Sequence, residues 1–252
     1  MRFDEIRIPC ATCDSVIARL SRTIVGGLVY GADRPRVFVL LDKNRIQSIN
    51  RAEDSIASMT VVDDPKAPFP GYFVRYKTKT EQRMFVAFHA YNWLRYQYKR
   101  GSAGAIMVDI DDTLIDGNES VHHGFQYMKE LYNQAGIMFP LHIVTARPRE
   151  DHHIVMKMLS ARGFCVPPDR LHMLPTDHYG KDTKYVEDFK WKTCMEISRL
   201  HHGVVARFGD KLWDCAHIKS LREDLAHVSD KDCYIFRDPR MKGCISYKLP
   251  GV

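Results

Sequence analysis

Residues 104–252 alternate short apolar runs with longer segments in which apolar residues recur every three or four positions. Short apolar runs between turn signals are typical of buried strands, and the longer period is typical of helices. The predicted strands lie at 105–109, 141–145, 171–174, 204–208 and 233–236, with predicted helices at 120–134 and 150–162 among them. This alternation predicts an α/β fold with a mostly parallel sheet and flanking helices.

Residues 1–103 have a less regular pattern. Strand-like runs occur at 23–30, 36–41, 59–62 and 72–76, and a helix is predicted at about 80–99. We therefore expect an α+β extension over residues 1–103 and an α/β domain over 104–252, divided in the basic, small-residue link 99–104. The alternative is that the helix before this link packs on the sheet of the second region.

The composition is that of an ordinary globular protein, with 252 residues of which 45% are hydrophobic. The longest apolar runs fall far short of the roughly 20 residues of a membrane span, and charges occupy residues 1–10 where a signal peptide is apolar. We therefore expect a cytoplasmic protein without a membrane partner. Seven scattered cysteines predict reduced thiols. Cys10 and Cys13 form a CxxC pair, but no second pair follows at the spacing of a zinc ribbon.

The positive charge is concentrated in the first region. Residues 1–103 hold 17 Lys+Arg against 10 Asp+Glu, a net +7, whereas the rest hold 20 against 21, a net −1. The densest stretch, 75–100, mixes basic and aromatic residues. Such a mixture suits phosphate contacts and base stacking, so nucleic acid binding through residues 1–103 is one interpretation. The other, which we favour, is a solvated basic face over an aromatic core.

Carboxylates follow the predicted strands. Asp109 and Asp111 end the first strand, and Asp210 and Asp214 follow the strand at 204–208. Thr145 ends the second strand, and the segment FKWKT (189–193) opens a predicted helix. Ligands of open α/β sheets bind outside the carboxyl ends of the strands, so we expect these residues to form one site.

This set resembles the haloacid dehalogenase (HAD) superfamily of phosphohydrolases. Four motifs match in order over about three fifths of the chain: DIDDT at 109–113, the threonine of HIVTARP, a lysine before a helix, and GDKLWD at 209–214. The resemblance implies a Rossmann-like HAD core and Mg²⁺ as cofactor. It also implies metal ligation by Asp109, the main-chain carbonyl of Asp111, and Asp210, with Asp214 in the metal set or orienting the lysine or a metal-bound water.

The same resemblance implies a two-step hydrolysis. Asp109 is the expected nucleophile and forms an aspartyl-phosphate. Asp111 is the expected general acid and base, and Thr145 holds a phosphoryl oxygen. Lys190 is the preferred lysine because Cys194 and Ile197 share its helical face, whereas Lys192 has a less consistent apolar face behind it.

The intervals between the motifs leave no room for an inserted cap domain. The chain therefore resembles the capless branch of the superfamily and, more loosely, the acid phosphatases within it. The predicted function is an Mg²⁺-dependent phosphomonoesterase acting on a small phosphorylated metabolite or nucleotide. One alternative is a phosphatase of nucleic acid ends that binds through residues 1–103. The other is a binding module without catalysis on the same scaffold.

Overall fold

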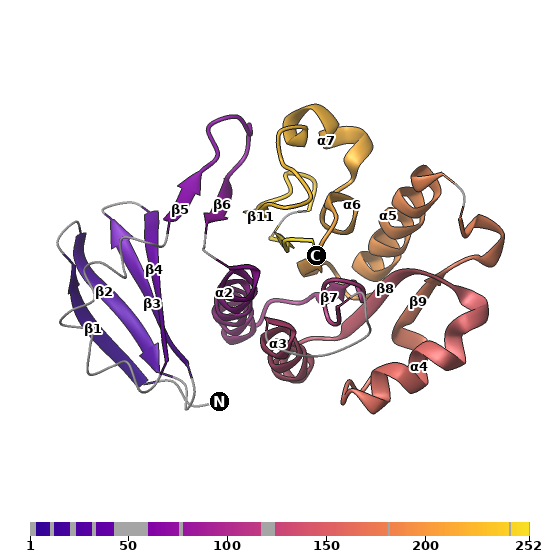
Figure 1. Ribbon diagram of the computed structural model, residues 1–252, viewed down its shortest axis with the longest axis horizontal. Coiled ribbons are helices and arrows are strands. Elements are labelled where there is room, and N and C mark those ends of the chain that lie inside the picture. Colours follow the sequence, from indigo (N-terminus) through magenta and orange to yellow (C-terminus); the bar gives the residue numbers. More distant parts are fainter. Residues whose placement is uncertain are drawn as a thin grey trace.

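The computed structural model describes residues 4–10, 13–20, 24–31, 34–42, 60–75, 78–116, 124–180, 182–241 and 243–251. The described residues form two sheets, with helices packed on the larger one (Figure 1). The smaller sheet is an antiparallel meander of β1 (Asp4–Cys10), β2 (Cys13–Leu20), β3 (Ile24–Gly31) and β4 (Arg34–Asp42). Cys10 and Cys13 lie opposite each other in the register of β1 and β2, and their side chains lie outside the described part.

The larger sheet has eight strands in the order β5-β6-β11-β12-β10-β7-β8-β9. Five neighbouring strands are parallel: β12 (Ile245–Lys248), β10 (Val204–Gly209), β7 (Ala105–Val108), β8 (Leu141–Pro148) and β9 (Leu171–Leu174). An antiparallel edge is formed by β5 (Thr60–Asp63), β6 (Gly71–Arg75) and β11 (Cys233–Phe236). The predicted α/β class with a mostly parallel sheet is confirmed, and the architecture is Rossmann-like.

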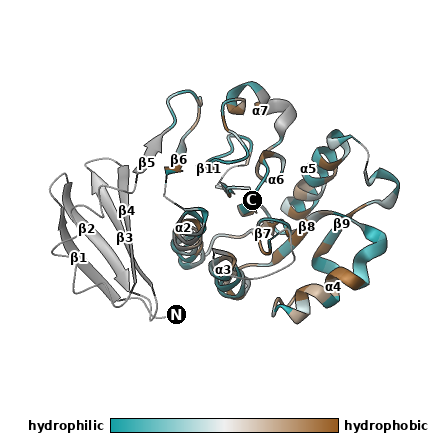
Figure 2. Ribbon diagram, viewed as in Figure 1, coloured by the Kyte–Doolittle hydropathy of each residue, from teal (hydrophilic) through white to brown (hydrophobic). Residues whose placement is uncertain are grey.

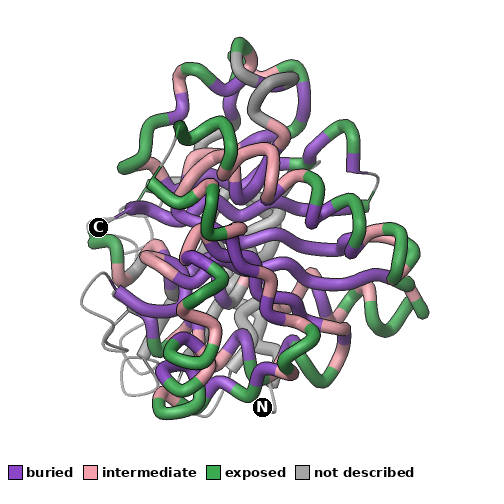
Figure 3. Tube along the Cα trace, turned by 90° about the vertical axis from the view of Figure 1, so that its right-hand side faces the viewer, coloured by how far each residue is buried: buried purple, intermediate pink, exposed green. Residues whose placement is uncertain are grey.

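Helices cover both faces of the parallel strands. The main core joins one face of the sheet to α2 (Lys79–Lys99), α3 (Gly124–Met138) and α4 (His152–Ala161). The opposite face packs on α5 (Thr183–Leu200), while α6 (Leu212–Cys215) and α7 (Ile218–Leu225) follow β10. Hydrophobic and hydrophilic residues alternate along α3 and α5 in Figure 2, and the central strands are buried in Figure 3.

The alternation along β7 shows why the strand is apolar throughout. Ile106 and Val108 face the core with α2 and α3, whereas Ala105 and Met107 face the core with α5. Successive side chains of a strand point to opposite faces, so apolar residues at every position suit a strand that is covered on both sides. All four residues of β7 are buried.

The first region contributes directly to the larger sheet. Strands β5 and β6 form its antiparallel edge, and α2 packs on it, with the Trp93 indole donating a hydrogen bond to the carbonyl of Val205 at 3.0 Å. The alternative expectation, that the helix before the 99–104 link packs on the sheet, is therefore confirmed. The expected division at 103/104 separates β5 and β6 from the other strands of the sheet to which they belong. Strands β1, β2 and β12 were not predicted.

The helix α2 explains part of the basic, aromatic stretch. Phe85 and Leu94 are buried in the main core, and Arg83 is 3% exposed. Tyr96, Tyr98, Lys99 and Arg100 are exposed at the end of the helix. Phe85 therefore belongs to the core as we favoured, whereas the buried Arg83 departs from the expected solvated basic face. Nucleic acid binding by the exposed remainder stays a prediction.

Three histidines join α5 to two strands at the amino ends of β8 and β9. The two ring nitrogens of the buried His142 lie 3.0 Å from His172 Nε2 and 2.8 Å from His201 Nε2. Burial, with the two neighbouring imidazoles, lowers the pKa of His142 to about 4. The three rings therefore form a neutral hydrogen-bonded chain at neutral pH.

Candidate active site

The site lies at the carboxyl ends of two adjacent parallel strands. Asp109 directly follows β7, and Asp210 directly follows β10. Val108 and Phe208 are paired in the sheet, and the amide of Asp109 donates to the carbonyl of Phe208 at 3.0 Å. This register brings together two carboxylates that are a hundred residues apart in the sequence.

Lys190 reaches this edge from the interior of α5. The expectation that FKWKT opens a helix was wrong, because α5 begins at Thr183. The Nζ of Lys190 donates to Asp109 Oδ1 at 2.8 Å and also to Asp214 Oδ1, and Lys190 is 2% exposed. Buried Thr193, Cys194 and Ile197 lie on α5 behind it. Lys192, by contrast, is exposed. The structure therefore brings Lys190 to the carboxylates and leaves Lys192 away from them.

Asp214 is held in place by the short helix α6. Its Oδ2 accepts a hydrogen bond from the amide of Lys211 at 3.0 Å, so it caps the turn in which it lies. The backbone of Gly209 passes directly beneath it, because a Cβ built at Gly209 would lie 2.1 Å from the Cβ of Asp214. Only a residue without a side chain permits this approach.

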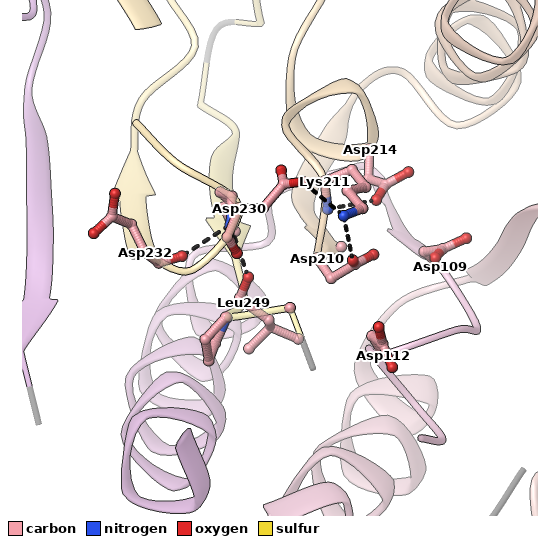
Figure 4. Close-up of polar contacts among 12 residues, drawn as sticks. Asp109, Asp112, Asp210, Lys211, Asp214, Asp230, Asp232 and Leu249 are labelled. Carbon is pink, nitrogen blue, oxygen red and sulfur yellow. Dashed lines mark hydrogen bonds and ion pairs between the residues drawn. The ribbon is translucent and has the colours of Figure 1, made fainter. Parts of the chain in front are cut away.

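Three carboxylates and one lysine make this cluster strongly negative. Asp109, Asp210 and Asp214 are buried and place one carboxylate oxygen each within 4.8 Å of one another (Figure 4). Burial raises the pKa of Asp109 well above its usual range, with the charges of Asp214 and Asp111 adding to the effect and Lys190 opposing it. Burial and the charge of Asp214 also raise the pKa of Asp210 to about 6.

The donor set fits a divalent cation. When all three carboxylates are ionised, the buried cluster carries −3 from the aspartates and +1 from Lys190. Buried charge without a partner is costly, and oxygen ligands alone are what Mg²⁺ prefers. A bound dication balances the remaining −2.

Two lysines, Lys211 and Lys248, bind the loop that bears Asp230, and Lys211 also lies near Asp210. Lys211 Nζ lies 3.6 Å from Asp210 Oδ2 and 2.8 Å from Asp230 Oδ2, and Figure 4 shows it beside both. Lys248, at the end of β12, donates to the carbonyls of Asp230, Asp232 and Leu249 at 2.8–3.1 Å. The loop bearing Asp230 is thus tied to the strand next to β10.

The two other predicted catalytic residues lie beside the carboxylate cluster. Arg147 binds both oxygens of Asp111, with Nη2 to Oδ1 at 2.8 Å and Nε to Oδ2 at 3.1 Å. The Asp111 side chain is 44% exposed, so its carboxylate is not part of the buried cluster. Thr145 is fully buried on β8, and its Oγ1 accepts a hydrogen bond from the amide of Arg147 at 3.2 Å.

Sequence reasoning missed two residues of α2 and the segment that they hold. Lys79 Nζ donates to the carbonyl of Gly251 at 2.5 Å, and Arg83 Nη2 donates to the carbonyl of Pro250 at 2.8 Å. The amide of Leu249 donates to the carbonyl of Gly209 at 2.7 Å, which brings this segment beside Asp210. The only sequence signal was the i, i+4 spacing of Lys79 and Arg83, which places both on one helix face.

The five cysteines whose side chains are described are free thiols, as expected: Cys165, Cys194, Cys215, Cys233 and Cys244. In the described part of the chain, the helices are too short or too polar to cross a membrane. Comparison of this sequence with known protein families and with curated proteins finds no match.

Proposed function

We propose that this protein is an Mg²⁺-dependent phosphomonoester hydrolase of the HAD type that acts through an aspartyl-phosphate. The observation that carries the proposal is the buried ammonium of Lys190 between Asp109 and Asp214, next to Asp210. A nucleophilic carboxylate, a fixed cation and an excess of negative charge at one sheet edge suit the transfer of a phosphoryl group.

We assign Asp109, Asp210 and the main-chain carbonyl of Asp111 to the metal. Asp214 belongs to the same cluster of buried carboxylates. When bound, Mg²⁺ supplies positive charge that offsets the repulsion between the carboxylates and the substrate phosphate. The raised pKa values of Asp109 and Asp210 support this assignment, because they reflect buried carboxylates with further carboxylates beside them.

In the first step, an oxygen of Asp109 forms a bond to phosphorus while the bond from phosphorus to the leaving oxygen breaks. Lys190 keeps Asp109 oriented through its 2.8 Å hydrogen bond and offsets the charge of the phosphoryl oxygens. Thr145 supports the adjacent backbone through its contact with the Arg147 amide. In the second step, the oxygen of a water molecule attacks the same phosphorus, and Asp109 is released together with inorganic phosphate.

Asp111 is the proposed proton donor to the leaving oxygen and the proton acceptor for the attacking water. Its bidentate ion pair with Arg147 must open before it can serve as an acid, because Arg147 occupies both carboxylate oxygens. We assign this opening to the arrival of the substrate, whose phosphate is a competing anion for Arg147.

The absence of an inserted cap among the described residues between β8 and α5 favours an open site. That interval contains α4, β9 and three short 3₁₀ turns: Arg149–Asp151, Pro168–Arg170 and Thr176–His178. We propose a small phosphorylated metabolite or a nucleotide as substrate. Nucleic acid ends remain the alternative, which rests on the basic and aromatic residues of the first region.

The test is hydrolysis of p-nitrophenyl phosphate and of a panel of phosphorylated metabolites, nucleotides and 3′- and 5′-phosphorylated oligonucleotides by the full chain. We expect activity with Mg²⁺, none with EDTA, and a loss of at least about 1,000-fold in Asp109→Asn. The exposed Lys192→Met variant is the matched control for Lys190→Met and keeps wild-type rates. No hydrolysis of any phosphomonoester, or full activity in Asp109→Asn, refutes the proposal.

A further inference from the structure

Arg83 is a buried cation at the junction of three segments around the site. It lies on α2, one turn after Lys79, and only 3% of it is exposed. Its guanidinium carbon lies 4.3 Å from the centre of the Phe125 ring at the start of α3. Burial on this scale is unusual for arginine, and the side chain must be accounted for by its partners.

The hydrogen-bond partners of Arg83 are main-chain carbonyls. Nη2 donates to Pro250 at 2.8 Å and to Asp112 at 3.3 Å, while the buried Nε has no partner among the described residues. These carbonyls belong to the loop after β7 and to the segment after β12. Arg83 therefore links two segments that flank the carboxylates and that are far apart in sequence.

The loop held at Asp112 has a strained backbone. Asp112 has φ +53°, a left-handed conformation that is uncommon for a residue other than glycine. Such a conformation persists only where surrounding contacts enforce it. The same loop contains Asp111, whose main-chain carbonyl is a proposed metal ligand.

The segment held at Pro250 lies against Asp210. A Cβ built at Gly251 would be 3.6 Å from Asp210 Oδ2, and the amide of Gly251 donates to the carbonyl of Asp230 at 3.0 Å. Lys79 Nζ donates to the carbonyl of Gly251 from the same face of α2. The segment 249–251 is therefore hydrogen-bonded both to side chains of α2 and to the carbonyl of Asp230.

We propose that Arg83 is a positioning residue, which fixes the Asp112 loop and the 249–251 segment so that the proposed metal ligands on either side keep their arrangement. This inference rests on the proposed function and assigns to α2, outside all four motifs, a part in the same site. The planar fork of arginine suits this role, because one guanidinium can hold two carbonyls at a fixed angle.

Charge and geometry predict opposite results for metal affinity. Arg83 lies within the electrostatic range of Asp112, Asp210 and Asp116. If its charge alone mattered, its removal would strengthen the binding of a dication to these carboxylates. If it positions the ligands, its removal weakens that binding despite the more negative site.

The experiment compares Arg83→Lys, Arg83→Met and the control Arg95→Met, which removes a half-buried arginine farther along the same helix. Mn²⁺ binding is measured by the electron paramagnetic resonance of the free ion, so that the result does not depend on turnover. Phosphatase kcat and KM are measured in parallel, and circular dichroism establishes that each variant is folded at the assay temperature.

We expect both Arg83 variants to bind Mn²⁺ at least tenfold more weakly, with kcat at least 30-fold lower and KM within threefold of wild type. Arg95→Met is expected to match wild type. Folded Arg83→Lys with a Kd for Mn²⁺ within twofold of wild type overturns the inference, as does tighter binding by Arg83→Met.

A milder variant keeps the inference testable if both Arg83 variants fail to fold. Lys79→Met alters an exposed side chain and removes only the bond to Gly251, so we expect it to fold and to bind Mn²⁺ two- to fivefold more weakly. Unchanged affinity for Mn²⁺ in that variant counts against the positioning of the 249–251 segment from α2.

If the wild-type protein hydrolyses no phosphomonoester, the proposed function fails, while the Mn²⁺ comparison still decides the role of Arg83.

Discussion

Replacing Lys190 by methionine removes a cation that contacts two of the three buried carboxylates. At an effective dielectric of 20, opposite charges 2.8 Å apart attract by about 6 kcal/mol, which is the scale of the Lys190–Asp109 pair. The variant no longer buries an ammonium, which offsets several kcal/mol of that loss. We therefore expect Lys190→Met to lower the free energy of unfolding by about 3–5 kcal/mol at pH 7 without metal.

The loss depends on pH with a definite sign. The pKa of Asp109 is raised, and that of Asp210 is about 6, by burial and neighbouring carboxylates. An acid whose folded-state pKa lies above its unfolded value destabilises the fold at neutral pH and does so less as the pH falls through the folded-state value. Without Lys190 both carboxyls take up protons more readily, so the cost of the substitution is smaller at pH 5 than at pH 7.

The assay is urea denaturation at pH 7 and pH 5 in EDTA. Lys192→Met, an exposed lysine two residues away, is the control and changes stability by less than about 0.5 kcal/mol. Adding Asp214→Asn to Lys190→Met removes one unbalanced charge and recovers about 1–3 kcal/mol, but no activity. Wild-type stability in Lys190→Met at pH 7, or an equal loss at both pH values, refutes this account of the cluster.

Two further predictions test the packing around the site and the histidine chain. Gly209→Ala places a methyl group 2.1 Å from the Cβ of Asp214, so we expect a melting temperature about 5 °C lower and loss of phosphatase activity; an unaltered thermal scan contradicts this. His142 stays neutral in the folded protein because its pKa is about 4, whereas the unfolded chain takes up a proton below about pH 6.5. Stability is therefore present above pH 6.5 and falls by about 2 kcal/mol as the pH drops toward 4. Denaturation curves of His142→Asn should show a flatter pH dependence, and an identical slope would exclude this histidine as the cause.

The sequence determined four of the five parallel strands and the edge at which the site lies. A strand covered on both faces is mostly apolar, so β7 and β10 stand out as largely apolar runs that end in Asp109 and Gly209-Asp210. Parallel strands end at the same edge, so the convergence of these two aspartates followed from the chain order of the elements. Helical periodicity also favoured Lys190, because buried Cys194 and Ile197 share its face.

Other features depended on tertiary contacts that no local pattern encodes. Strand β12 was missed although all four of its residues are buried, and the edge strands β5 and β6 join the sheet from the far side of the expected boundary. The ion pair between Arg147 and Asp111 forms over 36 residues of sequence, and the contact of Arg83 with Pro250 forms over 167.

Local sequence therefore set which segments form strands and helices and which carboxylates end them, because those outcomes follow from burial and from the periods of helix and strand. Only the folded chain decided that Arg147 pairs with Asp111 and that Arg83 binds the carbonyl of Pro250. The physical reason is that an ion pair or a hydrogen bond depends on the three-dimensional distance between two side chains, and that distance is set by the packing of whole elements against one another.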